Sequence, residues 1–138
     1  MQINKVYTYN KLQVIIDGIN SRVNQGLNIA VMAKDSSDSA LLFGSVQPSL
    51  HNADMIANHR DSTITFGETK VRFFKADWRS YCGMHFDILF IDSKVEYSEV
   101  LKAISMVRGV NNKEKSCFIL YDISEFELNA NTPLNTLT

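Results

Sequence analysis

An apolar run closed by an acid and a serine, FDILFIDS at Phe86–Ser93, constrains the fold of this chain more than any other stretch. A short run this rich in aliphatic and aromatic residues is typical of a strand buried on both faces, as in a parallel sheet covered by helices. Asp92 then lies at the carboxyl edge of the sheet. Because open α/β sheets bind ligands at that edge, Asp92 is the first candidate for a ligand-binding or metal-binding acid. Strand-end acids also cap neighbouring loops, and that structural interpretation stays open.

The whole chain is short and carries little net charge. Its 138 residues are enough for one hydrophobic core, and we expect a single domain over residues 1–125 with a frayed tail over 126–138. A net charge of −1 gives no basic field for obligate non-specific binding of nucleic acid. No window reaches the roughly 20 apolar residues of a membrane span, so we expect a soluble, cytoplasmic protein. Cys82 and Cys117 lack metal-ligand spacing and are predicted to be free thiols.

The first part of the chain alternates helical and strand patterns. Apolar residues recur at helical spacing over Thr8–Asn24, and Gly26 is placed to end that helix in a left-handed turn. The β-rich segment Leu27–Ala33 follows as a strand. The polar segment Lys34–Asp38 supplies N-caps for a second helix, which Pro48 ends. This succession indicates αβ layering.

The middle of the chain predicts a hairpin between two irregular segments. The polar stretch Ser49–Asp61 is expected to be a surface connection. Ser62–Phe66 and Val71–Ala76 are β-rich and flank a turn with a glycine, so they predict a hairpin. The segment Asp77–Met84 is expected to be a loop that leads into the central strand.

A helix and one more strand complete the predicted fold. Ser93 and Glu96 stand in capping-box spacing, which predicts that Ser93 begins the helix. Its inward face would consist of the apolar residues Tyr97, Val100, Leu101, Ile104 and Val107. Ser116–Tyr121 is a further buried strand, which brings Asp122 to the same edge as Asp92. We therefore predict one three-layer α/β domain, with a mainly parallel central sheet flanked by helices and one β-hairpin.

This order of elements resembles the ATPase domain of phage large terminase subunits, a RecA-like P-loop fold. Gly26–Lys34 is similar to the strand and polar turn of that family, and Ile64–Phe73 to its hairpin with a Phe-x-Asn-Gly-Ser pattern. Arg79–Gly83 is similar to an Arg-Gly step, and Phe86–Ser93 to the Walker B strand. The similarity runs from Thr8 to Ile123.

The departures from the terminase pattern fall on its catalytic parts. The window Lys5–Leu12 corresponds to the phosphate loop, but it lacks both glycines, and Leu12 replaces the hydroxyl that would hold Mg²⁺. Lys11 alone corresponds. Asp92 matches the metal-associated acid, whereas Ser93 stands in place of the catalytic glutamate that would polarise water. The resemblance thus implies a degenerate ATPase that has lost conventional ATP hydrolysis and needs no cofactor.

A second resemblance competes with the first. Phe86–Asp92, followed by Tyr97 and then by Phe118–Asp122, is also similar to the latter half of class I methyltransferases. Those enzymes bind S-adenosylmethionine through a glycine-rich turn after their first strand. The corresponding turn here, Lys34–Ser37, has no glycine.

Two sets of residues are candidates for binding. Lys11, Asp92 and Asp122 are candidate ligand-binding residues, and Asp92 is also the candidate metal ligand. The second set is a basic and aromatic surface that could bind phosphate, stack a base or anchor a protein partner. It consists of Arg72, Lys75, Trp78, Arg79 and Tyr81.

Our leading hypothesis is a non-catalytic, terminase-like binding protein of phage or mobile-element origin that regulates or mimics a larger machine. A protein partner is expected, with nucleic acid as an alternative partner and no membrane association. A small methyltransferase-like enzyme and a structural subunit of an assembly remain the alternative functions.

Overall fold

The structure is a computed structural model that describes residues 11–50, 54–107 and 115–120, and the structural statements below refer to these residues. Its elements are α2 (Lys11–Asn20), β1 (Asn28–Ala33), α3 (Ser36–Val46), the 3₁₀ helix η1 (Gln47–Ser49), β2 (Met55–Asn58), β3 (Thr63–Phe66), β4 (Thr69–Lys75), α4 (Trp78–Tyr81), β5 (Ile88–Asp92), α5 (Tyr97–Ile104) and β6 (Ser116–Leu120). Asp122 and the tail expected over 126–138 lie outside the described residues. Within them, no helix combines the length and apolar character needed to cross a membrane, and both cysteines are free thiols, as predicted.

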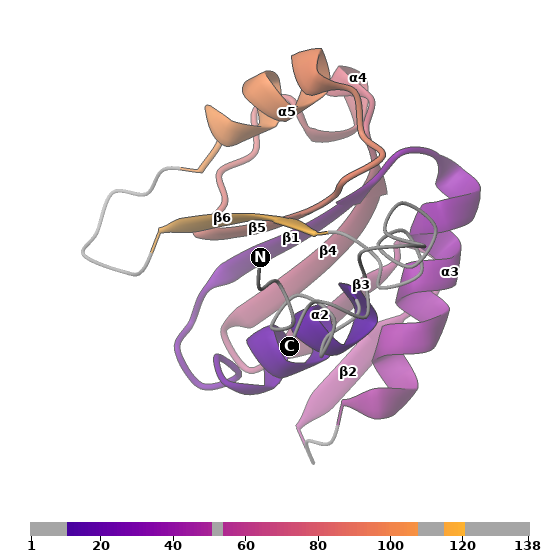
Figure 1. The fold of residues 1–138 in the computed structure, drawn as a ribbon. Coiled ribbons are helices and arrows are strands. Elements are labelled where there is room, and N and C mark those ends of the chain that lie inside the picture. The colour runs from indigo at the N-terminus through magenta and orange to yellow at the C-terminus, as the bar shows by residue number, and fades with distance from the viewer. Residues whose placement is uncertain (1–10, 51–53, 108–114, 121–138) are drawn as a thin grey trace, which may run out of the picture.

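In the described part of the chain, six strands form one mixed sheet in the order β2-β3-β4-β1-β5-β6 (Figure 1). β1 pairs in parallel with β4 and β5, and β5 pairs in parallel with β6. β3 is antiparallel to both β2 and β4. The chain is therefore an α/β protein with the predicted hairpin, β3–β4. A mainly parallel sheet is not confirmed, because the β2-β3-β4 end is antiparallel.

Two segments expected to be irregular contain regular structure. The predicted connection Ser49–Asp61 includes strand β2, whose Met55 and Ala57 pack partly buried against the core while Ile56 is exposed. A strand of four residues with two half-buried side chains leaves a weak pattern in the sequence. The predicted loop Asp77–Met84 includes the short helix α4, which Asp77 caps by accepting a hydrogen bond from the backbone N–H of Arg79.

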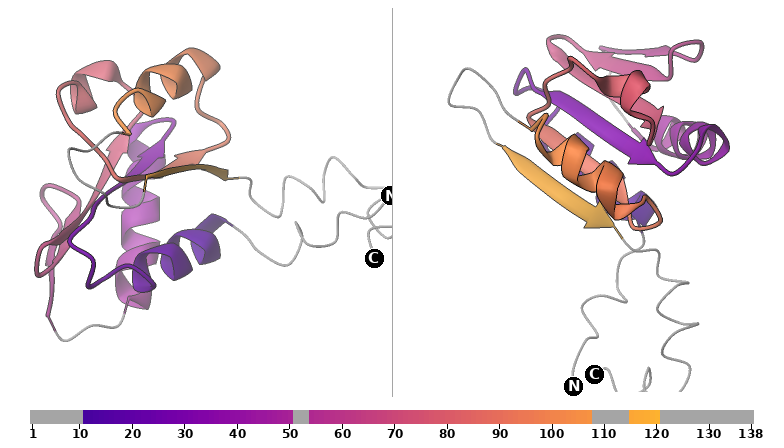
Figure 2. Two further views of the ribbon diagram at one scale, coloured as in Figure 1. Left: turned by 90° about the vertical axis from the view of Figure 1, so that its left-hand side faces the viewer. Right: turned by 90° about the horizontal axis from the view of Figure 1, so that it is seen from above.

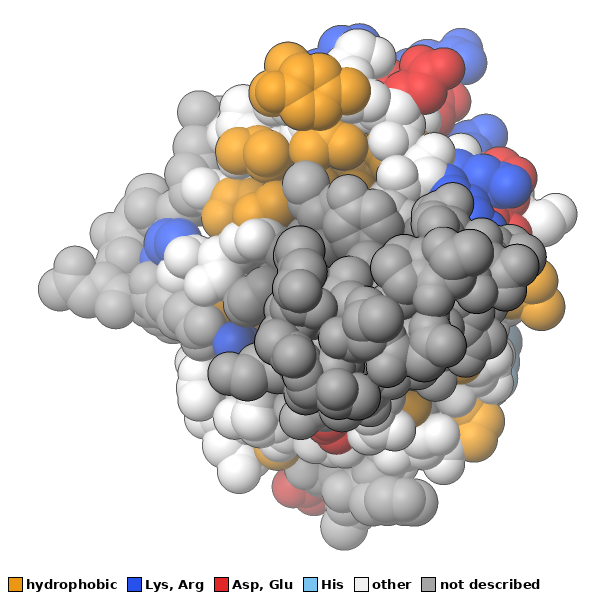
Figure 3. All heavy atoms as spheres, in the orientation of Figure 1, with side chains coloured by type: hydrophobic (Ala, Val, Ile, Leu, Met, Phe, Trp, Pro, Cys, Tyr) orange, Lys and Arg blue, Asp and Glu red, His pale blue; other side chains and the backbone are white. Residues whose placement is uncertain are grey.

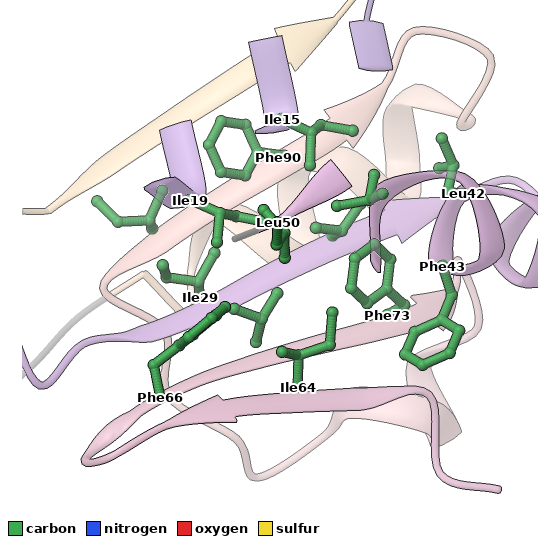
Figure 4. Close-up of a cluster of buried hydrophobic side chains, with 14 of the residues drawn as sticks. Ile15, Ile19, Ile29, Leu42, Phe43, Leu50, Ile64, Phe66, Phe73 and Phe90 are labelled. Atoms are coloured by element: carbon green, nitrogen blue, oxygen red, sulfur yellow. The ribbon is translucent and has the colours of Figure 1, made fainter. Parts of the chain in front are cut away.

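Helices cover the two faces of the sheet separately (Figures 1 and 2). α2 and α3 pack on one face, where Ile29 and Val31 of β1 join the larger core cluster, shown in Figure 4. α4 and α5 pack on the other face, where Ala30 and Met32 join the second cluster. The apolar side chains of β5 alternate between the same two clusters, and every residue of this strand is buried. The prediction of a strand buried on both faces is confirmed.

Helix α5 differs from its prediction in both its start and its buried face. Its N-cap is Glu96, without a side-chain hydrogen bond, so the capping box that begins at Ser93 is wrong. Val100 and Ala103 are buried, whereas three predicted inward residues are exposed. They are Tyr97 at 74%, Leu101 at 52% and Ile104 at 41%.

A contact from α4 accounts for the orientation of α5. The hydroxyl of the buried Tyr81 donates a hydrogen bond to the Glu99 carboxylate at 2.6 Å, which directs that side of the helix toward the sheet. The opposite side exposes Tyr97, Leu101 and Ile104, which we call the α5 stripe. In Figure 3 hydrophobic side chains gather on the surface over α5.

The connection between α2 and β1 is held by a buried side chain from β4. α2 ends at Asn20 rather than at the predicted Asn24, and hydrogen-bonded turns continue the chain to Gly26. Gly26 has φ 64°, which confirms the predicted left-handed turn. The hydroxyl oxygen of Thr69, which is fully buried, accepts from the backbone N–H groups of Gly26 at 2.8 Å and Leu27 at 3.3 Å.

Candidate functional site at the carboxyl edge of the sheet

An open groove lies at the carboxyl ends of β1 and β4 and extends past the end of β5. Its larger part has a volume of about 640 Å³ and its smaller part about 310 Å³. β1 leads into α3 on one face of the sheet, whereas β4 leads into α4 on the other (Figure 2). Ligands of open α/β sheets bind at such a topological switch point. We call this feature the carboxyl-edge groove; its lining residues are Lys34, Asp35, Ser36, Ser37, Lys75, Ala76, Asp77, Arg79, Lys94, Val95, Glu96 and Glu99.

The charges of the carboxyl-edge groove are largely paired. The Asp77 carboxylate lies 3.5 Å from the Arg79 guanidinium and 3.9 Å from the Lys75 ammonium. The backbone N–H of Arg79, and then its guanidinium, lower the pKa of the Asp77 carboxyl from its usual value. Lys34 lies 3.7 Å from Asp38 on α3. A ligand of this groove therefore meets alternating charges, which suits a polar protein surface better than a lone anion.

Asp92 lies at the carboxyl edge, as predicted, but its carboxylate takes part in the turn after β5. Its Oδ1 accepts from the backbone N–H of Lys94 at 3.1 Å, and its carbonyl accepts from the N–H of Val95 at 3.0 Å. The residue is 4% exposed and does not line the carboxyl-edge groove. Asp92 thereby shapes the turn that places Lys94 and Val95 at the groove.

The predicted set of Lys11, Asp92 and Asp122 stays a prediction. Lys11 begins α2, but its side chain is outside the described part, as is the whole of Asp122. Among the described residues, no group of three or more histidine, cysteine, aspartate and glutamate side chains is placed to hold a metal ion.

The predicted basic and aromatic surface does not form one patch. Lys75 and Arg79 line the carboxyl-edge groove, and Arg72 lines a different groove on the face of the sheet. Trp78 is 38% exposed and contacts the ring of Tyr81 edge-on at 5.3 Å. The placement of Tyr81 on this surface is wrong, because it is a core residue.

The burial of Tyr81 follows from its neighbours and its hydroxyl partner. Its ring stacks on Phe74 at 5.5 Å, and Glu99 accepts the hydrogen bond of its hydroxyl. Sequence reasoning also missed Lys34, Asp35, Lys94 and Glu99 as groove residues. Lys34 directly follows the end of β1 and Lys94 is the second residue after the end of β5, and that position was the available signal.

The Tyr81 hydroxyl predicts a loss of stability at high pH. Burial, and then the Glu99 carboxylate, raise the pKa of this hydroxyl above its usual value near 10. Above pH 10 the unfolded chain therefore loses this proton while the folded chain keeps it. The free energy of unfolding should fall by up to about 1.4 kcal/mol per pH unit from this group.

Urea unfolding of Tyr81→Phe and the unmodified chain from pH 8 to 11 measures this effect. At pH 8 we expect Tyr81→Phe to be less stable by about 1–3 kcal/mol, because the hydrogen bond to Glu99 is lost. The difference should narrow toward pH 11. Tyr97→Phe, at an exposed position, should run parallel to the unmodified chain. A Tyr81→Phe difference that stays constant with pH contradicts the assignment.

The fold has a counterpart among solved structures. No protein-family model and no curated protein matches this chain. The crystal structure of the HK97 bacteriophage large terminase is similar to it, with a TM-score of 0.64 and 12% sequence identity. The fold is terminase-like. The similarity covers 89% of this chain and 31% of that chain. At this identity it shows the fold alone, and the terminase-like resemblance is confirmed at that level.

Proposed function

We propose that this chain is a non-catalytic, terminase-like binding domain of phage or mobile-element origin that regulates or mimics a larger machine. The observation that carries the proposal is the end of β5. Asp92, at the position of the metal-associated acid in the terminase pattern, is buried and bonded to the N–H of Lys94, and Ser93 follows it instead of glutamate. No carboxylate in this motif is available to activate water, so binding without turnover is favoured.

Two surfaces support a protein partner. The carboxyl-edge groove presents paired charges of both signs, with Trp78 nearby on α4. The α5 stripe places three apolar side chains in solvent on a helix of eight residues. Exposed apolar patches with a polar surround mark protein contact sites, and aromatic side chains dominate their binding energy.

Measurement of phosphate release by the full chain in the presence of Mg²⁺-ATP tests the absence of turnover. We expect no phosphate release above the protein-free blank, for the unmodified chain, for Asp92→Ala and for the control Asp17→Ala on the exposed side of α2. Turnover that is abolished in Asp92→Ala and kept in Asp17→Ala overturns the proposal.

Light scattering distinguishes a chain that binds a different protein from a chain that assembles with copies of itself. A stable homo-oligomer that Leu101→Lys dissociates, and that Leu41→Lys leaves intact, would instead make the chain a structural subunit built through the α5 stripe. Leu41 is a matched control because it is 67% exposed on α3, away from that stripe. A monomer at all concentrations leaves a different protein as the partner.

A further inference from the structure

A second groove lies on the face of the sheet near the antiparallel end. We call it the sheet-face groove, and its volume is about 280 Å³. Its polar lining residues are Asp61, Thr63, Lys70, Arg72 and Ser80. Lys70 and Arg72 are two residues apart on β4, so they point to the same face, and Arg72 lies opposite Thr63 of β3. Two cations and two hydroxyls thus converge on one small cavity.

The cations of the sheet-face groove lack the pairing seen at the carboxyl edge. Lys34, Lys75 and Arg79 each lie within 4.0 Å of a carboxylate. Over residues 11–50, 54–107 and 115–120, neither the Lys70 nor the Arg72 side chain forms an ion pair or hydrogen bond, although both residues are half-buried. Asp61, the acid of this groove, accepts from the Asn58 amide at 3.1 Å.

Two unpaired cations on one partly buried face destabilise the folded chain, and a bound anion would remove that destabilisation. Two like charges on alternate residues of one strand, whose Cα atoms lie roughly 7 Å apart, repel each other, and burial removes part of their hydration. A phosphate between Lys70 and Arg72 would cancel that repulsion and accept charge-assisted hydrogen bonds from both. Phe74 and Met84 supply an apolar wall beside these donors, on which a base or sugar can pack.

The rim of the sheet-face groove is already fixed in shape. In the loop from β2 to β3, the Asn58 side-chain oxygen accepts from the N–H groups of Arg60 at 3.0 Å and Asp61 at 3.2 Å. Ser62 follows with φ 53°, and its carbonyl accepts from the N–H of Phe73 at 3.0 Å. A serine at positive φ is strained, and the surrounding hydrogen bonds hold it there. Binding at a wall that is ordered in advance costs less conformational entropy.

We propose that the sheet-face groove binds the phosphate of a nucleotide unit, either as a mononucleotide or as one unit of a single strand of nucleic acid. Lys70 and Arg72 bind the phosphate, and the hydroxyls of Thr63 and Ser80 complete the donor set. The volume of about 280 Å³ suits one such unit rather than a duplex. Among the residues that the structure describes, the site shares no lining residue with the carboxyl-edge groove. Its failure would therefore leave the proposed function untouched.

Fluorescence anisotropy of a labelled dT12 strand, titrated with the full chain at several salt concentrations, tests the proposal. We expect Lys70→Gln and Arg72→Gln each to weaken binding by about tenfold or more. Each should also reduce the slope of log affinity against log salt by about 0.7. Lys102→Gln is the matched control, because it removes one exposed charge on α5 and should change neither quantity by more than about twofold. Thermal unfolding of each variant shows that it is folded.

Competition with AMP shows whether the phosphate in the sheet-face groove comes from a mononucleotide or from a strand of nucleic acid. Displacement of dT12 by AMP shows that a mononucleotide fills the site. No displacement, with binding that still depends on Lys70 and Arg72, assigns the site to the strand. The proposal is overturned if neither dT12, AMP nor phosphate binds at low salt, or if Lys102→Gln weakens binding as much as Arg72→Gln does.

Discussion

Phe90→Ala should lower the free energy of unfolding by about 3–5 kcal/mol, a large share of the 5–15 kcal/mol that typically holds a domain folded. The Phe90 ring is 1% exposed on β5 and lies beside Ile15 and Ile19 of α2 in Figure 4. An added Cβ at Gly18 would come within 2.5 Å of its Cζ atom, so helix and ring are already in close contact. Removal of the ring therefore leaves a cavity between β5 and α2.

Urea unfolding measures this loss, with Leu41→Ala as the exposed control that should change stability by less than about 0.5 kcal/mol. The contact with Gly18 adds a sharper test. Alone, Gly18→Ala should destabilise by overpacking against Phe90. In the Phe90→Ala background the same change should stabilise, because alanine favours the helix by about 1 kcal/mol and the ring is gone. If the sign does not reverse, α2 does not pack on Phe90 as described.

Thr69→Val should cost about 2–4 kcal/mol, although the two side chains have nearly the same shape. The Thr69 hydroxyl oxygen is the acceptor for the N–H groups of both Gly26 and Leu27, and the hydroxyl lies 3.4 Å from the Arg22 carbonyl, to which it donates. Valine removes that acceptor. The N–H of the buried Leu27 then loses its partner without gaining a water molecule, and the partly buried Gly26 N–H loses its bond to Thr69.

Thr69→Ser is the control for this result, since it keeps the hydroxyl and deletes one methyl group. We expect it to lose about 1 kcal/mol in the same urea titration. Equal losses for the serine and valine variants would show that packing, not hydrogen bonding, makes Thr69 important.

The sequence predicted best where one physical requirement dominates. β5 must be apolar on both faces, so its eight-residue segment was recognised and Asp92 was placed correctly at the carboxyl edge. Gly26 was recognised because a left-handed turn excludes most side chains. The order of elements that follows from these features also supported the terminase-like fold.

Prediction failed where two local choices have similar free energy. α5 contains two apolar stripes, and periodicity cannot say which one is buried; the bond between Tyr81 and Glu99 decides it in the folded protein. Ser93 satisfies a capping pattern, yet the turn held by Asp92 moves the start of the helix to Glu96. The grooves depend on which strands become neighbours, and β1 lies between β4 and β5, which are distant from it in sequence.

The mixed sheet also implies an order of events during folding. β2, β3 and β4 pair with their sequence neighbours, so their loops are short and close quickly. In the described sheet, β1 pairs only with residues about 40 and 60 positions away, since Ile29 pairs with Val71 and Ile88, so its pairing requires the closure of longer loops. We therefore expect amide protons of Ile64 and Phe66 to gain protection in pulse-labelled refolding before those of β1. β1, the strand that completes the core, would then also join β2, β3 and β4 on one side to β5 and β6 on the other in one cooperative unit.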